Sequence, residues 1–270
     1  ATQSFGKLDV TGNFGGNIRR NDEFRSNYST NSIVVPKIYN LSNSAITPTV
    51  GNSEFHSGVN SMYGSGVLTW NSLATLEVTG RNDYASTLPK DNSSFFYPSV
   101  NGSLVLSDLF PSITTGGWVT YAKLRGGYAQ VGSDASAYQL QTTFSGSSSK
   151  FGGRTLFTLP DASNNANLKP ERTFGVEGGL EVSILEDRIT LDATYYTKKT
   201  KDQIFGLAQA PAIGYSSAIV NAGQMSNKGI EALVTLKMLE LNNGLSWRTT
   251  INYTRNRNTV DELAPGLTTI

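Results

Sequence analysis

The sequence predicts an all-β protein, a segment of an antiparallel transmembrane β-barrel. Three observations lead to this prediction. Apolar and polar residues alternate with period two in segments of about a dozen residues, and the connections between these segments alternate between long and short. Charge is also sparse, because charged residues make up 16% of the 270-residue chain against roughly 25% in soluble domains.

The alternation is clearest in residues 187–197, where Ile189 and Leu191 share one face and Thr190 and Asp192 share the other. The same test predicts about nine strands. They lie near 5–18, 58–69, 73–82, 98–107, 118–131, 171–184, 187–200, 228–239 and 245–257. These segments are about twice as long as the 5–6 residues common in soluble sandwiches, which favours strands that cross a membrane.

The connections between the predicted strands alternate strictly in length. Long connections are predicted near 19–57, 83–97, 132–170 and 201–227, and short ones at 69–72, 108–117, 185–187 and 240–244. Outer-membrane barrels have short periplasmic turns and long extracellular loops, so the long set is predicted to be extracellular. The prolines agree with this assignment, because none falls inside a predicted strand, although Pro98 begins one and Pro265 lies beyond the last.

About nine strands cannot close a bacterial barrel, which uses an even number. An open edge in hydrocarbon leaves backbone amides and carbonyls unpaired at several kcal/mol each. We therefore expect residues 1–270 to form part of a single larger barrel domain, with the missing strands supplied by another stretch of polypeptide.

Composition excludes several classes of function. The net charge is +1 with no block of like charge, so nucleic acid is not expected as a partner. The chain has no cysteine, which removes disulfides and thiolate chemistry. Its apolar runs are far shorter than the roughly 20 residues of a spanning helix.

Catalysis and metal binding have little support in the sequence. The single histidine, His56, lies in a predicted loop without a recognisable nucleophile motif, so the protein is not expected to be an enzyme and no cofactor is predicted. Glu177, Glu181 and Asp192 could suggest a glycosidase pair, but they fit better as lumen-facing acids that are solvated or paired with basic side chains. These basic residues are Lys123, Arg125 and Arg248. Asp83, Asp91 and Asp134 lie in predicted loops without the spacing of an EF-hand, which leaves a loop calcium site open.

Ligand binding is the function class that remains. Aromatic loop residues offer stacking faces, and charged residues on the lumen side offer hydrogen bonds. The candidate substrate contacts are Tyr84, Phe95, Phe96, Tyr138, Arg125, Glu177 and Tyr215. The alternative is that the aromatic side chains pack the loops together or contact a partner protein that covers them.

Several motifs resemble a known family, and they occur in that family's order over most of the chain. They are GGNIRRN at 15–21, LEVTGRNDY at 76–84, STLP at 86–89, FYPSV at 96–100, KLRGGYAQVG at 123–132, NLKPERT at 167–173, GYSSA at 214–218, NAG at 221–223 and NKGIE at 227–231. Together they resemble the barrel of SusC/RagA-type TonB-dependent transporters.

The resemblance implies the middle of a barrel of about 22 strands that encloses an N-terminal plug. It also implies active import of glycan or peptide fragments across the outer membrane of a Gram-negative bacterium, in particular one of the Bacteroidetes. TonB would act through the plug, a SusD-like surface lipoprotein would cover the loops, and two transporter–lipoprotein pairs could form a dimer. A passive porin or structural barrel, or a soluble carbohydrate-binding β-protein, remain the alternatives.

Overall fold

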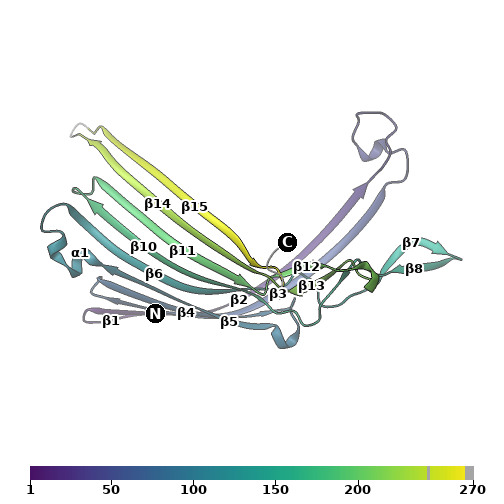
Figure 1. The fold of residues 1–270 in the computed structure, drawn as a ribbon, viewed down its shortest axis with the longest axis horizontal. Helices are drawn as coiled ribbons and strands as arrows, with labels where there is room; N and C mark the ends of the chain where they lie inside the picture. Colours follow the sequence, from purple (N-terminus) through teal and green to yellow (C-terminus); the bar gives the residue numbers. More distant parts are fainter. Residues whose placement is uncertain (242–243, 265–270) are drawn as a thin grey trace.

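The protein folds into one large antiparallel sheet, seen in a computed structural model that describes residues 1–241 and 244–264. Its ten strands follow the order β1-β2-β3-β4-β5-β6-β10-β11-β14-β15. They span Thr2–Phe5, Leu8–Ser29, Thr49–Trp70, Ala74–Ala85, Ser94–Val105, Val119–Ser133, Glu171–Ile184, Ile189–Lys201, Gln224–Glu240 and Ser246–Glu262. Figure 1 shows a curved wall whose edge strands, β1 and β15, remain apart. The predicted antiparallel all-β fold is confirmed.

Smaller elements decorate the two ends of the wall. At the end with the long connections, β7 (Ser145–Phe151) pairs with β8 (Arg154–Thr158), and β12 (Ile204–Ala208), β13 (Ser217–Asn221) and β9 (Ala162–Ser163) form a three-stranded sheet. The single-turn helices η1, η2 and η4 span Leu41–Asn43, Lys90–Asn92 and Pro211–Ile213. At the opposite end, α1 (Leu106–Leu109) and η3 (Pro111–Ile113) connect β5 to β6 (Figure 1). None of the helices in the described ranges has the length and apolar character to cross a membrane.

All nine predicted strands are present, but the prediction of a loop over 19–57 is wrong. β2 and β3 are 22 residues long each and pair along their whole length, from Leu8 with Trp70 to Ser29 with Thr49. Only 30–48 remains as a loop. Alternation fails as a signal in this extension because water contacts both faces, so neither face needs apolar residues.

The other boundaries moved for local reasons. A turn at Gly6 separates the short β1 from β2, which adds a tenth strand to the predicted nine. Pro98 lies inside β5 rather than at its start. Its missing N–H is tolerated because pairing of β5 with β6 begins only at Ser99.

Two of the predicted short connections, near 69–72 and 185–187, are tight turns. Asn71 and Ser72 have φ of 51° and 57°, and Glu186 and Asp187 have φ of 56° and 61°, which are left-handed values expected in tight turns. Residues 242–243 of the predicted connection at 240–244, and Pro265, lie outside the described residues.

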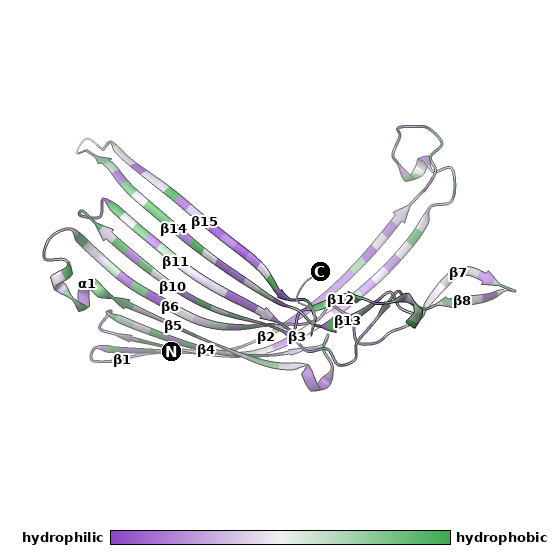
Figure 2. Cartoon of the chain, viewed as in Figure 1, coloured by the Kyte–Doolittle hydropathy of each residue, from purple (hydrophilic) through white to green (hydrophobic). Residues whose placement is uncertain are grey.

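The register separates an apolar face from a polar face across the whole sheet. Leu191 lies opposite Val182 on one side and Val234 on the other, whereas its neighbour Asp192 lies opposite Glu181. Because side chains alternate along a strand, these two rows point to opposite faces. Large apolar side chains such as Phe14, which is 78% exposed, therefore cover one face of this single-layered wall. Figure 2 shows the resulting alternation along the strands.

A small hydrophobic core lies at the loop end of the wall. Val59, Ala85, Phe95 and Ala135 pack there with Leu88 and the fully buried Leu168. The core fastens the connections that follow β4 and β6 to the sheet. These connections border the candidate site described below.

The two faces should respond differently to charge. Ala232 lies on the apolar face of β14 and Leu233 on the polar face. Arginine near the bilayer midplane costs about 2–4 kcal/mol on a lipid-facing position. We expect Ala232→Arg to lower the free energy of unfolding by about that amount in full-length protein refolded into lipid bilayers, whereas Leu233→Arg should cost well under half as much. Equal costs for the two variants would contradict the assignment of faces.

Candidate functional site

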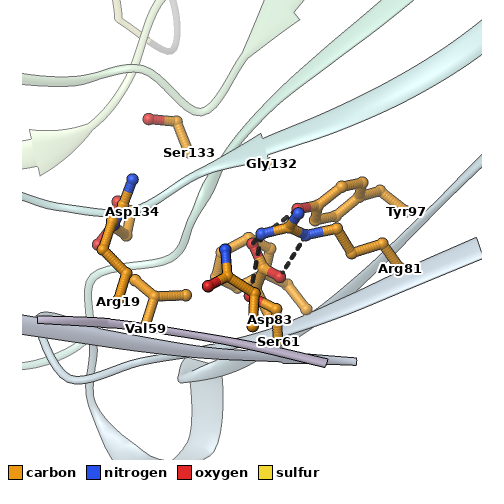
Figure 3. A pocket seen from close by; sticks show the side chains of 11 residues that line it. Arg19, Val59, Ser61, Arg81, Asp83, Tyr97, Gly132, Ser133 and Asp134 are labelled. Atoms are coloured by element: carbon orange, nitrogen blue, oxygen red, sulfur yellow. Dashed lines mark hydrogen bonds and ion pairs between the residues drawn. The ribbon is translucent and has the colours of Figure 1, made fainter. Parts of the chain in front are cut away.

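A hollow of about 360 Å³ opens on the polar face near the loop end, between β2, β3, β4 and the end of β6. Its centre is a hydrogen-bonded cluster around Asp83 (Figure 3). Arg81 Nε donates to Asp83 Oδ1 at 2.8 Å, and the Tyr97 hydroxyl donates to Asp83 Oδ2 at 2.6 Å. Arg81 also donates to the Ser61 hydroxyl at 2.9 Å. These contacts compensate the negative charge of the Asp83 carboxylate, which needs them because its side chain is only 11% exposed.

Strand pairing brings these four residues together from three strands. Asp83 lies opposite Ser61 of β3, and Arg81 lies opposite Tyr97 of β5. Positions 81 and 83 are two residues apart, so their side chains share a face. Tyr97 stacks on the ring of Phe95 at 6.0 Å between centroids, which ties the polar cluster to the hydrophobic core beneath it.

Two asparagines hold the segment that packs under this cluster. Asn92 Nδ2 donates to the Leu168 carbonyl at 3.0 Å. Asn221 uses both atoms of its amide, accepting from the Lys169 N–H and donating to the Lys169 carbonyl, each at 2.8 Å. The NLKPERT and NAG motifs therefore meet in space, and they fix the backbone at the rim of the site.

A second hollow of about 690 Å³ adjoins the first, because Arg19 and Asp134 line both. Phe55 forms its aromatic wall and stacks on Tyr138 at 6.1 Å. The Arg25 guanidinium lies 4.9 Å from the centre of the Phe55 ring. The two hollows form one groove with cations, carboxylates and aromatic faces along it, which we call the polar-face groove.

A third hollow of about 230 Å³ lies closer to the middle of the wall, around Arg125. Arg125 extends from β6 over β10 to reach β11, where it forms an ion pair with Asp192 at 2.5 Å and donates to Thr194 at 2.6 Å. Gly179 of β10 makes this crossing possible, since a Cβ there would lie 2.6 Å from Arg125 Nε. Pairing of Asp192 with Arg125 was one of the predicted roles for that acid.

The predicted contact residues are divided between the two faces. Arg125 and Glu177 line the third hollow, Phe95 lines the first, and Tyr138 packs at the second. Phe96 and Tyr84 share the face of Asn82, opposite to that of Asp83, and both are largely exposed there. Tyr215 lies apart from these residues, in the connection between η4 and β13.

Sequence reasoning did not find the cluster around Asp83, and it placed three acidic residues in loops as possible calcium ligands. Asp83 lies within β4, and its carboxylate is bound by Arg81 and Tyr97. Asp91 lies in η2, and Asp134 accepts a hydrogen bond from Thr87 at 3.0 Å. Within the described ranges, no group of three or more acidic or histidine side chains is placed to hold a metal ion. Period-two spacing of Arg81 and Asp83 was the signal that could have placed them on one face.

His56 also lies in a strand rather than in the predicted loop. Pairing of β3 with β4 begins at Val59, and His56 lies in the part of β3 before this residue. Trp70, at the other end of β3, is 14 positions away. A crossing takes about 9–11 residues, so this extension projects out of the membrane. His56 Nδ1 lies 2.7 Å from Asp22 Oδ1, and this hydrogen bond raises the pKa of the imidazole above its usual 6.5. Glu54 adds a weaker contribution from 3.7 Å.

The groove provides binding chemistry rather than an arrangement for bond cleavage. Arginines and carboxylates supply donors and acceptors, and the rings of Phe55, Tyr97 and Tyr138 supply stacking faces. The Asp83 carboxylate is engaged by two donors, so it is not poised to act as a general base.

Comparisons with known proteins point to one family. The family described as "TonB dependent receptor-like, beta-barrel" matches residues 1–269. The chain is 30% identical over 193 residues to TonB-dependent receptor P3 of Formosa agariphila, covering 70% of this chain and 19% of that protein. It is 29% identical over 231 residues to TonB-dependent receptor P26 of the same organism, covering 83% of this chain and 23% of that protein. The chain thus spans about a fifth of the length of these relatives.

Solved structures with the same fold include two transporters. A chain of the RagAB peptide transporter superimposes with a TM-score of 0.83 and 19% identity, over 98% of this chain and 30% of that one. The outer membrane transporter YddB from Escherichia coli superimposes with a TM-score of 0.58 and 14% identity, over 96% of this chain and 32% of that one.

The central ion pair of the groove can be tested by removing its cation. Arg81→Ala leaves the nearly buried Asp83 carboxylate with Tyr97 as its remaining strong donor, and such a loss costs about 1–3 kcal/mol. We expect the free energy of unfolding of the full-length protein to fall by this amount, and Arg81→Lys to recover part of it. Arg19→Ala, which removes an exposed arginine from the same hollow, serves as the control and should cost little. If Arg81→Ala cost no more than Arg19→Ala, the proposed importance of the pair would be refuted.

The histidine pair predicts a specific pH dependence. A raised pKa in the folded state means that the pair stabilises the fold fully below pH 6.5, and that this contribution is lost as pH rises through the folded-state pKa. In NMR titrations of the full-length protein, with the His56 signal assigned by its loss in His56→Gln, Asp22→Asn should lower the pKa of His56 distinctly. Glu54→Gln should lower it less. A larger effect of Glu54→Gln would contradict the assigned hydrogen bond.

Proposed function

Because this chain belongs to the TonB-dependent receptor-like β-barrel family, we propose that it forms part of a transporter that imports oligosaccharide or peptide fragments across the outer membrane by TonB-dependent active transport. The observation that carries the proposal is the polar-face groove. In a barrel, the apolar face contacts lipid and the polar face lines the lumen, so the groove opens into the transport path at its extracellular end.

The composition of the groove suits a hydrogen-bonding solute. Arg19 lines both of its hollows and is exposed, without a side-chain partner among the described residues. Phe55 and Tyr138 offer the stacking surface that a sugar ring or an aromatic peptide side chain would use. Both solute classes fit this chemistry, and the experiment below distinguishes them.

We also propose that a SusD-like surface lipoprotein covers the loops. The likeness of the fold to that of RagAB supports this partner. Exposed aromatic side chains on the projecting β7–β8 hairpin (Figure 1) support it as well, since Phe151 next to the hairpin turn is 77% exposed and Phe157 nearer its base is 68% exposed. Exposed apolar surface of this kind is typical of protein interfaces.

Uptake experiments in the source bacterium test the transport proposal. We expect deletion of the gene for the full-length protein, and separately deletion of TonB, to abolish energy-dependent uptake of fluorescent oligosaccharides or of fluorescent peptides. Uptake that persists without TonB but disappears without this protein would identify a passive porin. Uptake unchanged in both deletion strains would reject a transport role for both solute classes.

The role of the groove is tested by two arginines of the polar face. Arg19 lies in the groove, whereas Arg248 lies near the turn end of β15, opposite Lys237, and lines none of the three hollows. A hydrogen bond to a charged group is worth about 1.5–3 kcal/mol, so Arg19→Ala should weaken binding of the imported solute about tenfold or more. Arg248→Ala should leave affinity near the wild-type value. Calorimetry on the purified protein measures both, and equal affinities would remove the groove from the binding path.

A further inference from the structure

Six basic side chains gather on the apolar face of the wall, on the four neighbouring strands β10, β11, β14 and β15. They are Arg172, Lys199, Lys201, Lys228, Arg255 and Arg257. The register places them together, because Arg172 lies opposite Lys201, Lys228 lies opposite Arg257, and Arg255 lies opposite Ile230. We call this set the outer basic belt. All six are exposed.

Side chains that are an even number of positions apart on a strand share a face, and this alternation places the belt on the apolar face. Lys199 is an even number of positions from Leu191, and its Cα partner is Phe174. The Lys201 ammonium lies 6.0 Å from the centre of the Phe174 ring, which places it on the same side. Lys198, in contrast, lies over Tyr196 on the polar face. The belt therefore points away from the transport path.

The height of the belt matches one crossing of a membrane. Lys199 is ten positions from Ile189 at the turn end of β11, and Arg257 is ten positions from Trp247 at the turn end of β15. A tilted strand crosses the hydrocarbon in about 9–11 residues. On β11 the residues between Ile189 and Lys199 on that face are apolar or uncharged, and on β15 the first charge after Trp247 is Arg255, eight positions along, so the belt begins where the hydrocarbon ends.

The staggered arrangement of the six residues follows the tilt of the strands. The turn between β10 and β11 lies at Ile189, which pairs with Leu236, yet β14 continues to Glu240 before its own turn. The turn of the β14–β15 hairpin therefore lies lower in the register than the turn of the β10–β11 hairpin. The belt descends in the same direction, from Arg172 of β10 to Arg255 of β15, so it stays close to one level above the membrane.

The belt makes no ion pair with an acid on its own face. Over 172–184, 189–201, 226–236 and 246–259, the acidic residues are Glu177, Glu181, Asp192 and Glu231, and all lie on the polar face. Two acids reach the face of the belt at the upper end of β15: Asp261 accepts a hydrogen bond from Ser226, and Glu262 lies opposite Gln224. None of the six basic side chains makes an ion pair or a side-chain hydrogen bond within the described residues. Figure 2 shows the hydrophilic stretch that this produces in the half of β15 near the C-terminal end.

We propose that the outer basic belt binds the phosphate groups of an anionic glycolipid in the outer leaflet. Clustered arginine and lysine side chains at an interface attract anionic headgroups, and arginine pairs with phosphate through two parallel hydrogen bonds. The acyl chains of the same lipid would lie against the apolar residues below the belt, on the strands that carry it. The inference concerns the outside of the barrel and does not depend on the proposed transport function.

The test uses full-length protein in detergent and three matched probes: bis-phosphorylated lipid A, its dephosphorylated form and inorganic phosphate. The variant Lys199→Gln, Lys228→Gln, Arg257→Gln removes three charges from the belt. The control variant Lys198→Gln, Lys237→Gln, Arg248→Gln removes three charges from the polar face of the same strands. We expect bis-phosphorylated lipid A to raise the Tm of the wild type and of the control, and at least half of this shift to disappear in the belt variant. The shift should also decline with added salt.

Several outcomes would overturn the proposal. An undiminished shift in the belt variant, or an equal loss in the control, would remove the belt as the binding site. An equal shift with dephosphorylated lipid A would assign the effect to acyl chains, and an equal shift with inorganic phosphate would assign it to the free anion. If the belt variant fails to fold, the single variant Arg257→Gln and the charge-preserving Lys199→Arg, Lys228→Arg replace it. A smaller Tm shift in Arg257→Gln together with a full Tm shift in the Lys199→Arg, Lys228→Arg variant supports the proposal. A full shift in Arg257→Gln together with a smaller shift in the charge-preserving variant refutes it.

Discussion

The constraint on which this structure depends is that hydrocarbon offers no hydrogen bonds to a peptide group. Every backbone N–H and C=O at membrane depth must therefore find its partner in a neighbouring strand. Continuous ladders meet this requirement for the strands between β2 and β15, and the open edges of the wall require further strands. Once the ladders exist, period-two geometry divides all side chains between lipid and lumen, and each position along a strand acquires a face and a height.

The polar face shows how such a wall can build a site without a conventional core. Large side chains lie across neighbouring strands where a glycine leaves room, as Arg125 does over Gly179 and Tyr63 does over Gly15. The cluster around Asp83 uses the same principle of cross-strand contact, because its members come from β3, β4 and β5. A binding surface thus arises from register, while the small core around Leu168 fastens the loops that border it.

The two faces carry charge for different reasons. The central charges of the polar face form ion pairs, between Arg81 and Asp83 along β4 and between Arg125 and Asp192 across strands. The basic side chains beyond the apolar band on the other face form no ion pair within the described residues. This asymmetry is what a leaflet rich in phosphate would select, and it extends the functional surface of the wall to its outside.

The sequence by itself determined the strand pattern, the alternation of turns and loops, and the family motifs, because each depends on local spacing. Only the tertiary structure decided which distant residues meet. Asp83 became part of a cluster rather than a loop ligand because its partners Ser61 and Tyr97 lie on other strands. The long β2–β3 extension, which includes His56, also required the paired strand to be seen, since a ladder with water on both faces imposes no hydrophobic period on its residues.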